Sequence, residues 1–283
     1  MGSEMCIRDR LYAEQINFSF IQAFIQPDPA YYGIAWIFRH IFEDIIYFNF
    51  FISSVTVILY YKFCKNQNYP LIAFFVGLPF FIIYTINFPR QAIAMAIAAF
   101  SFKYLLSEQK VRYILGIFIA ILFHKTAIFY LIFLINGLKK VKTSSLLWFS
   151  LLFSLLFYVF LSSRLMGFIS DFSEILTSNA AHLKGIIYLL PAFAYMLFRK
   201  RILAVFKENE RNFLDFFCFI IITSYLLLFL NNFFYNAIDR FLIYFLPFEI
   251  MIFGNYLPRL INQGQIHYYA CLLYTSDAAD EFM

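Results

Sequence analysis

Charged side chains are scarce in this sequence of 283 residues: they make up 14% of it, whereas hydrophobic residues make up 63%. About a quarter of the residues of a soluble domain are charged. Long stretches, such as 71–89 and 216–238, contain no charged residue at all. Bilayer-spanning helices have this composition, because each backbone polar group is satisfied within its own segment. The scarcity of charge excludes an ordinary soluble domain and predicts an all-α, polytopic transmembrane helical bundle.

Cysteine is also scarce, with four residues in the chain and no Cys-x-x-Cys pair. Cys64 and Cys218 fall in or beside apolar segments, so neither a disulfide framework nor a metal site is indicated. The Walker A, Gly-x-Gly-x-x-Gly, His-Glu-x-x-His and Gly-x-Ser-x-Gly motifs are absent in any usable context, as is an Asp-x-Asp motif. We therefore expect no metal, no cofactor and no nucleic-acid partner, and a nucleotide-driven enzyme is disfavoured.

The two ends of the chain differ in composition from the rest. MCIRDR (5–10) and CLLYTSDAADE (271–281) resemble translated sequencing adaptor, which recurs at the ends of proteins predicted from metagenome assemblies. The alternative is a polar N-terminus and a polar tail. Because both strings occur together, we expect residues 1–10 and 271–283 to be artefacts and 11–270 to form a single transmembrane domain. The natural chain would then extend further on both sides.

Apolar segments and the basic residues between them predict the topology. The apolar segments fall at about 44–61, 71–86, 91–106, 112–138, 145–163, 185–198, 213–230 and 238–257. The connectors that are rich in lysine and arginine should face the cytoplasm. Their basic residues are Lys62, Lys65, Lys103, Lys110, Arg112, Lys139, Lys140, Lys142, Arg199, Lys200, Arg201, Lys207, Arg211 and Arg259.

Segment 112–138 decides how these connectors are distributed. If it is a single span, the basic connector after it lies outside and the charge rule is broken once. If it is a hairpin bent at His124-Lys125, all the basic connectors share the cytoplasm. Each arm would then be about 13 residues, or roughly 20 Å, so the turn must lie in a protein-lined cavity. We favour the hairpin, which gives about 8–9 membrane segments.

Four polar groupings reach the outer face together in the hairpin topology. They lie at 87–91, 124–126, 164–184 and 231–240, at or inside the ends of the apolar segments. Ionisable groups within membrane segments are costly and usually serve a function. We therefore expect the functional site at this face.

Arg90 stands at the start of a predicted helix, directly after Pro89, a residue that favours the first helical position. Its guanidinium suits bidentate binding of phosphate or carboxylate, and a helix N-terminus adds backbone donors. The alternative is an arginine that extends to the membrane interface. Arg240 stands one turn inside a helix start in the same way. Asp239 beside it either belongs to the site or pairs locally with a cation.

His124 lies within an apolar segment, where it can act as a general base near neutral pH. The alternative is a buried histidine that is hydrogen-bonded to a neighbouring carbonyl. Lys125 either adds charge towards an anion or extends to the interface. A site with two arginines, a lysine and a histidine suggests a diphosphate-bearing lipid as ligand. The leaving group of such a lipid is already activated, so no nucleotide need be bound.

Two motifs carry a resemblance to a known family. An N-x-x-R-Q-x-x-A helix occurs at 87–94, and an A-x-L-F-H-x-[ST]-A segment occurs at 120–127. Together with PDPAYYGIAWIFRHIF (27–42) and AIDRFLIYFLPFEIMIFGNYLP (237–258), they resemble the EpsG family, Wzy-like polymerases of bacterial exopolysaccharide and capsule. The later stretch contains Arg240, Tyr244 and Phe245 of the family's R-x-x-x-Y-F segment.

The resemblance implies a multi-pass glycosyltransferase of the bacterial cytoplasmic membrane. It would transfer a growing glycan from undecaprenyl diphosphate onto another lipid-linked repeat unit at the outer face. The expected partners are the undecaprenyl-diphosphate-linked oligosaccharide, the lipid bilayer and other polysaccharide-assembly proteins. The expected catalytic residues are His124, Arg90 and Arg240, and the expected substrate-binding residues are Asn87, Gln91, Lys125, Asp239 and Tyr244. A lipid-linked sugar flippase or transporter, a membrane acyltransferase that uses His124, and a non-enzymatic scaffold remain alternatives.

Overall fold

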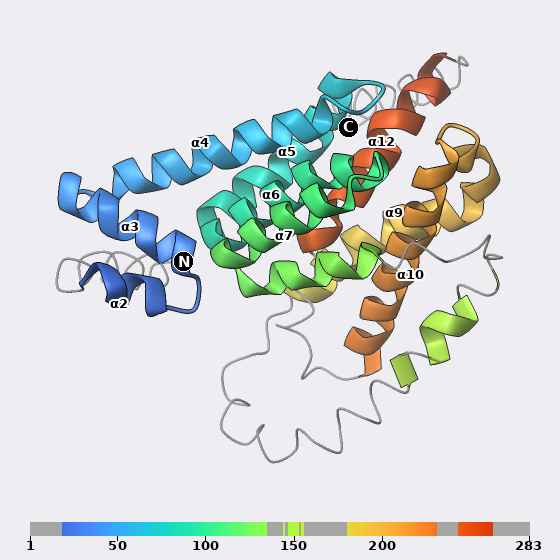
Figure 1. Cartoon of the computed structure of the whole chain (residues 1–283). Coiled ribbons are helices and arrows are strands. Elements are labelled where there is room, and N and C mark those ends of the chain that lie inside the picture. The colour runs from blue at the N-terminus through green and yellow to red at the C-terminus, as the bar shows by residue number, and fades with distance from the viewer. Residues whose placement is uncertain are drawn as a thin grey trace, which may run out of the picture. The chain divides into compact units, whose positions relative to one another are not determined.

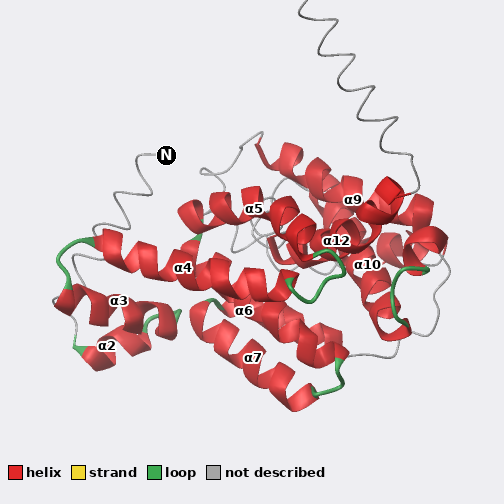
Figure 2. Ribbon diagram, turned by 90° about the horizontal axis from the view of Figure 1, so that it is seen from above, coloured by secondary structure: helices red, strands yellow, loops and turns green. Residues whose placement is uncertain are grey.

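A computed structural model of the chain shows helices throughout the part that it describes, which confirms the all-α prediction (Figures 1 and 2). The described residues are 19–134, 144, 147–152, 154–155, 180–230 and 243–262. Both predicted artefacts, 1–10 and 271–283, lie outside them. Most of the predicted segment 145–163 does so as well.

Most helices follow the predicted apolar segments to within a few residues at most of their ends, but residues 20–25 and 29–41, which lie outside every predicted segment, are helical as well. In chain order they are α2 (Phe20–Ile25), α3 (Pro29–Ile41), α4 (Ile45–Cys64), α5 (Pro70–Asn87), α6 (Pro89–Leu106), α7 (Lys110–Phe123), the 3₁₀-helix η2 (Lys125–Leu134), α9 (Ala180–Leu203), α10 (Glu208–Leu230), the 3₁₀-helix η5 (Ile243–Phe245) and α12 (Leu246–Asn262). They form two compact units: 1–66 with 78–140, and 67–77 with 141–283.

Helix α4 is, within the described ranges, the one helix long and apolar enough to cross a membrane. Its mean hydropathy reaches 1.4, and 22% of its most apolar window is buried inside the protein. The expected total of about 8–9 membrane segments stays a prediction.

Helix α6 is the centre of the first unit, where it packs against both α4 and α7 (Figure 1). Its alanines are almost completely buried, and small side chains allow neighbouring helices to approach closely. The buried alanines are Ala92, Ala94, Ala96, Ala98 and Ala99. The approach to α7 is tightest at Gly116, where an added Cβ would lie 2.0 Å from Oγ of Ser101.

The basic residues of the predicted cytoplasmic connectors in the first unit gather at one end of these helices. The ammonium groups of Lys62 in α4 and Lys103 in α6 lie 5.9 Å and 3.7 Å from the centre of the Phe100 ring. The C-terminal ends of α4 and α6 therefore lie together. Lys110 and Arg112 follow at the start of α7, a few residues beyond α6. This grouping agrees with the predicted sharing of one membrane side by these connectors.

The predicted break at His124-Lys125 is present in the structure. Helix α7 ends at Phe123, His124 has an extended backbone (φ −161°, ψ 120°), and η2 begins at the next residue. The hydroxyl of Tyr113 donates a hydrogen bond to the carbonyl of Tyr130 over 2.6 Å, so η2 folds back on α7. In one continuous helix these two residues would lie about 25 Å apart. The structure thus favours the hairpin over the single span.

A largely buried ion pair joins α9 and α10 in the second unit. Arg199 donates to both carboxylate oxygens of Asp215, over 2.7 Å from Nε and 2.6 Å from Nη2. The hydroxyl of Tyr195 also donates to this carboxylate, over 2.7 Å. Such a bidentate pair fixes the angle at which the two helices meet.

Candidate functional site

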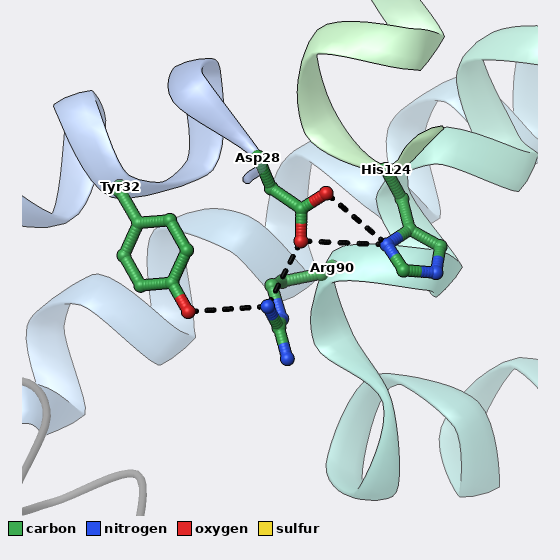
Figure 3. Close-up of polar contacts among 4 residues, drawn as sticks. All are labelled: Asp28, Tyr32, Arg90 and His124. Atoms are coloured by element: carbon green, nitrogen blue, oxygen red, sulfur yellow. Dashed lines mark hydrogen bonds and ion pairs between the residues drawn. The ribbon is translucent and has the colours of Figure 1, made fainter. Parts of the chain in front are cut away.

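Three helix ends meet in the first unit and bring four polar side chains together (Figure 3). Asp28 precedes α3, Arg90 is the second residue of α6, and His124 joins α7 to η2. Tyr32 lies one turn into α3. Although 62 and 96 residues of sequence separate Asp28 from Arg90 and His124, their side chains are in direct contact.

The Asp28 carboxylate is the centre of this cluster, with only 2% of the residue exposed. Nη1 of Arg90 donates a hydrogen bond to Oδ2 over 2.9 Å. Nδ1 of His124 lies 3.3 Å from Oδ1 and 3.4 Å from Oδ2. Arg90 Nη1 also donates to the hydroxyl of Tyr32 over 3.1 Å. The carboxylate therefore ties the arginine to the histidine.

The start of α3 directs Asp28 towards these partners. Asp28 occupies the N-cap position, and Pro29 follows as the first helical residue. An N-cap aspartate usually accepts a hydrogen bond from its own helix. The Asp28 side chain makes no such bond, although its carbonyl accepts the first helical N–H from Tyr32 over 3.1 Å. Its carboxylate is thus committed to the neighbouring helices.

The start of α6 positions Arg90. Pro89 is the first residue of this helix, as predicted, and Phe88 before it provides no side-chain cap. The arginine side chain is 42% exposed, and its guanidinium lies 5.6 Å from the centre of the Tyr32 ring. Arg90 therefore contacts Asp28 through one nitrogen while much of its side chain remains accessible to a ligand.

The charges around Asp28 keep it ionised. Burial alone would raise the pKa of this carboxyl, because a low dielectric disfavours the charged form. The hydrogen bond and charge of His124, followed by the charge of Arg90, outweigh burial and hold the Asp28 pKa below its ordinary value of 3.8. The backbone N–H of Lys125 lowers the pKa further. Asp28 is consequently a carboxylate at neutral pH.

This arrangement can orient a base and bind an anion. Because Nδ1 of His124 faces a carboxylate, it is assigned the proton, which leaves Nε2 with a lone pair. A carboxylate that holds a histidine in this way also stabilises the imidazolium formed when Nε2 accepts a proton. The histidine side chain is 15% exposed. The alternative expectation is a histidine hydrogen-bonded to a neighbouring carbonyl. In the structure, Nδ1 of His124 instead faces the carboxylate of Asp28.

The other predicted site residues in the first unit have different environments. Asn87 is the last residue of α5 and precedes α6 by two positions. Gln91 follows Arg90 in α6 and is 3% exposed. Lys125 is exposed, and its backbone, rather than its ammonium, contacts Asp28.

Of the remaining predicted residues, Tyr244 belongs to the second unit. Tyr244 lies in η5 and is buried, with 2% exposure. Arg240 and Asp239 lie outside the described residues.

Sequence reasoning missed Asp28 and Tyr32. Both lie within 27–42, a stretch that carried part of the family resemblance, and Asp28 stands between two prolines. A lone carboxylate in a chain so poor in charge was the available signal. No local periodicity relates it to Arg90 or His124, so the contact emerges only from the packing of α3, α6 and α7.

The part of the chain that the structure describes is a helical protein whose polar centre is a buried carboxylate, Asp28, in contact with His124 and the half-exposed Arg90. The sequence model of the EpsG family matches residues 10–278. This match covers most of the chain, which therefore belongs to the EpsG family. Membership places the chain among exopolysaccharide-associated membrane proteins. No curated protein and no solved structure matches the chain.

Proposed function

We propose that this protein is a polysaccharide polymerase of the bacterial cytoplasmic membrane. As an integral-membrane glycosyltransferase, it joins undecaprenyl-diphosphate-linked repeat units at the outer face. Membership of the EpsG family supports the exopolysaccharide context. The observation that carries the proposal is the contact of Arg90 and His124 with one buried carboxylate. An anion-binding group and a base held together are what glycosyl transfer from a diphosphate requires.

The proposed reaction is a displacement at the anomeric carbon of the growing glycan. A hydroxyl oxygen of the acceptor sugar forms a bond to this carbon, and the bond from the carbon to the phosphate oxygen breaks. Undecaprenyl diphosphate leaves with the bonding electron pair, and the acceptor's proton passes to Nε2 of His124. The diphosphate is already an activated leaving group, so the transfer uses no nucleotide.

Arg90 is proposed to stabilise the negative charge that builds on the leaving diphosphate. Preorganised positive groups of this kind act most strongly where charge develops in the transition state. Contact with Asp28 and Tyr32 fixes the Arg90 guanidinium in advance, through Nη1 alone. Its other N–H groups then define a direction from which a phosphate can approach. Arg240 is the proposed second cation.

His124 is proposed to deprotonate or orient the acceptor hydroxyl, with Asp28 as its positioning residue. The carboxylate fixes the ring and balances the charge of the imidazolium. Lys125, whose side chain is exposed, is the proposed auxiliary cation. The other proposed substrate contacts are Asn87, Gln91, Asp239 and Tyr244. Gln91 and Tyr244 are buried, so a direct contact with substrate requires the chain to open around them.

The test compares glycan chain lengths made by arginine variants of the full chain in a host that depends on it. Arg90→Ala and Arg240→Ala should abolish long chains and leave single repeat units. Arg39→Ala is the matched control: Arg39 lies at the end of α3 and donates to the Glu43 carbonyl over 2.7 Å, away from the cluster. Wild-type chain lengths in both test variants would overturn the proposal. Acyl transfer that needs His124 but not Arg90 would favour the acyltransferase.

A further inference from the structure

Helix α2 presents an apolar face to its surroundings. Ile21 and Ile25 are 70% and 76% exposed. Residues four apart lie on the same side of a helix, so these two isoleucines form one continuous strip. The hydroxyl of Ser19 and the side chain of Gln22 close the helix start in a capping box, which fixes the short helix and its outward face.

The side of α2 that carries Phe20, Ala23 and Phe24 packs on α3. Ala23 is completely buried, and Phe24 packs so closely on α3 that a Cβ added at Gly33 would lie 2.7 Å from its ring. The Phe20 ring meets Trp36 edge to face, with centres 5.2 Å apart. The outward direction of Ile21 and Ile25 is therefore set by packing.

Neither helix can cross a bilayer. Helix α2 has six residues and α3 has 13, which correspond to about 9 Å and 20 Å against a hydrocarbon core of about 30 Å. A helix that lies along the membrane surface buries an exposed apolar face at the boundary between headgroups and acyl chains. Aromatic residues such as Trp36 are enriched at the same depth.

The apolar face continues into the helix that is suited to cross the membrane. Helix α3 ends at Ile41, and α4 begins four residues later (Figure 1). Ile41 and Ile46, on either side of this connection, are both mostly exposed. The rings of Phe38 in α3 and Phe51 in α4 lie 5.0 Å apart, so the two helices are packed together. Helix α4 is suited by length and composition to the lipid core, and the exposed apolar residues Ile46 and Ile41 extend its apolar surface to α3, on which α2 packs.

We infer that α2 and α3 lie in the interfacial zone of the bilayer, with Ile21 and Ile25 inserted into the acyl chains just beneath the headgroups. Asp28 lies in the connection between α2 and α3. If the proposed function holds, this position of α2 and α3 places the Asp28–Arg90–His124 cluster at headgroup depth, where the diphosphate of a lipid-linked glycan is found.

The depth of single probes tests the inference. The full chain, with its native cysteines replaced, receives one cysteine at position 21 or 25, which is coupled to a bimane fluorophore. The labelled protein is reconstituted into phosphatidylcholine–phosphatidylglycerol vesicles that contain lipids brominated near the headgroup or deep in the acyl chain. Ile58→Cys in α4, an exposed apolar position, is the deep control. Ser107→Cys in the connector after α6 is the polar control.

Probes at positions 21 and 25 should be quenched more strongly by shallow than by deep bromine. The position 58 probe should show the reverse order, and the position 107 probe should resist both. Three results would overturn the inference. The probe at position 25 could resist both brominated lipids, as the probe at position 107 should. It could be quenched most strongly by the deep bromine, or it could be shielded from water only at a high protein-to-lipid ratio. The last would indicate a second copy of the chain. None depends on polymerase activity, so failure here is distinguishable from failure of the proposed function.

Discussion

Replacing Asp28 by asparagine would separate the charge of this side chain from its shape. Asparagine fills the same volume at the start of α3 and is equally acceptable as an N-cap residue. Because asparagine is uncharged, it cannot attract the Nδ1–H of His124 as a carboxylate does, and it cannot balance the positive charge of the imidazolium. We therefore expect Asp28→Asn to fold, to be moderately destabilised and to lose most of its polymerase activity.

The magnitude follows from the two contacts. The Arg90 bond is short, at 2.9 Å, but the arginine is 42% exposed, so solvent replaces much of it. The His124 contacts are longer, at 3.3 and 3.4 Å, but less exposed. Charge-assisted hydrogen bonds contribute about 1.5–3 kcal/mol when sheltered, so a total loss of about 1–3 kcal/mol is expected.

The loss of stability should depend on pH. The pKa of Asp28 is lower in the folded protein than its ordinary value of 3.8, so folding favours the carboxylate. The stabilising contribution is then fully present above about pH 4 and is lost as pH falls through the folded-state pKa. In detergent, wild-type protein should melt at a higher temperature than Asp28→Asn at neutral pH, and the difference should disappear in strong acid.

The activity assay is a double-mutant cycle on polymerisation by the reconstituted protein. A general base contributes about 10²- to 10⁴-fold, so His124→Gln should lose that amount, and Asp28→Asn up to the same amount. Because Asp28 acts partly through His124 and partly through Arg90, the double variant should lose less activity than the product of the two single losses. Asp44→Asn is the matched control, since Asp44 caps α4 through the N–H of Ile46 and asparagine caps equally well. Multiplicative losses in the double variant would refute the reasoning.

Two further predictions concern packing and topology. Gly116→Ala should cost about 1–3 kcal/mol, because its new Cβ would collide with Ser101; the added change Ser101→Gly should restore the melting temperature, and no recovery would contradict this account of the contact. Lys125→Cys should react with an impermeant thiol reagent added outside right-side-out vesicles and Ser107→Cys only after permeabilisation, because α7 separates them; protection of the cysteine at position 125 from the reagent would return 112–138 to the single-span topology.

The helices could be predicted because their signals are local. Apolar runs located most of the helices, Pro89 marked the start of α6, and the polar pair His124-Lys125 marked the break before η2. Each of these signals lies within a few residues of the feature that it predicts. The charge rule added one long-range inference, the sharing of one end by Lys62 and Lys103, which the Phe100 contacts support.

The centre of the site could not be predicted in the same way. Arg90 and His124 were found as costly groups in apolar surroundings, each considered on its own. The carboxylate that joins them comes from a connection before α3, 62 residues from one and 96 from the other. Local propensity would have used Asp28 to cap α3. Its actual orientation depends on the packing of three helices, which no sequence period records.

The most direct test of the central claim uses the full chain, purified and reconstituted with radiolabelled undecaprenyl-diphosphate-linked repeat units. The measured quantities are the undecaprenyl diphosphate released and the glycosidic bonds formed. The account predicts one released diphosphate for each new bond, with both products falling together by about 10²-fold or more in His124→Gln. Undiminished bond formation in His124→Gln, or movement of lipid-linked units across the bilayer without any new bond, would contradict it.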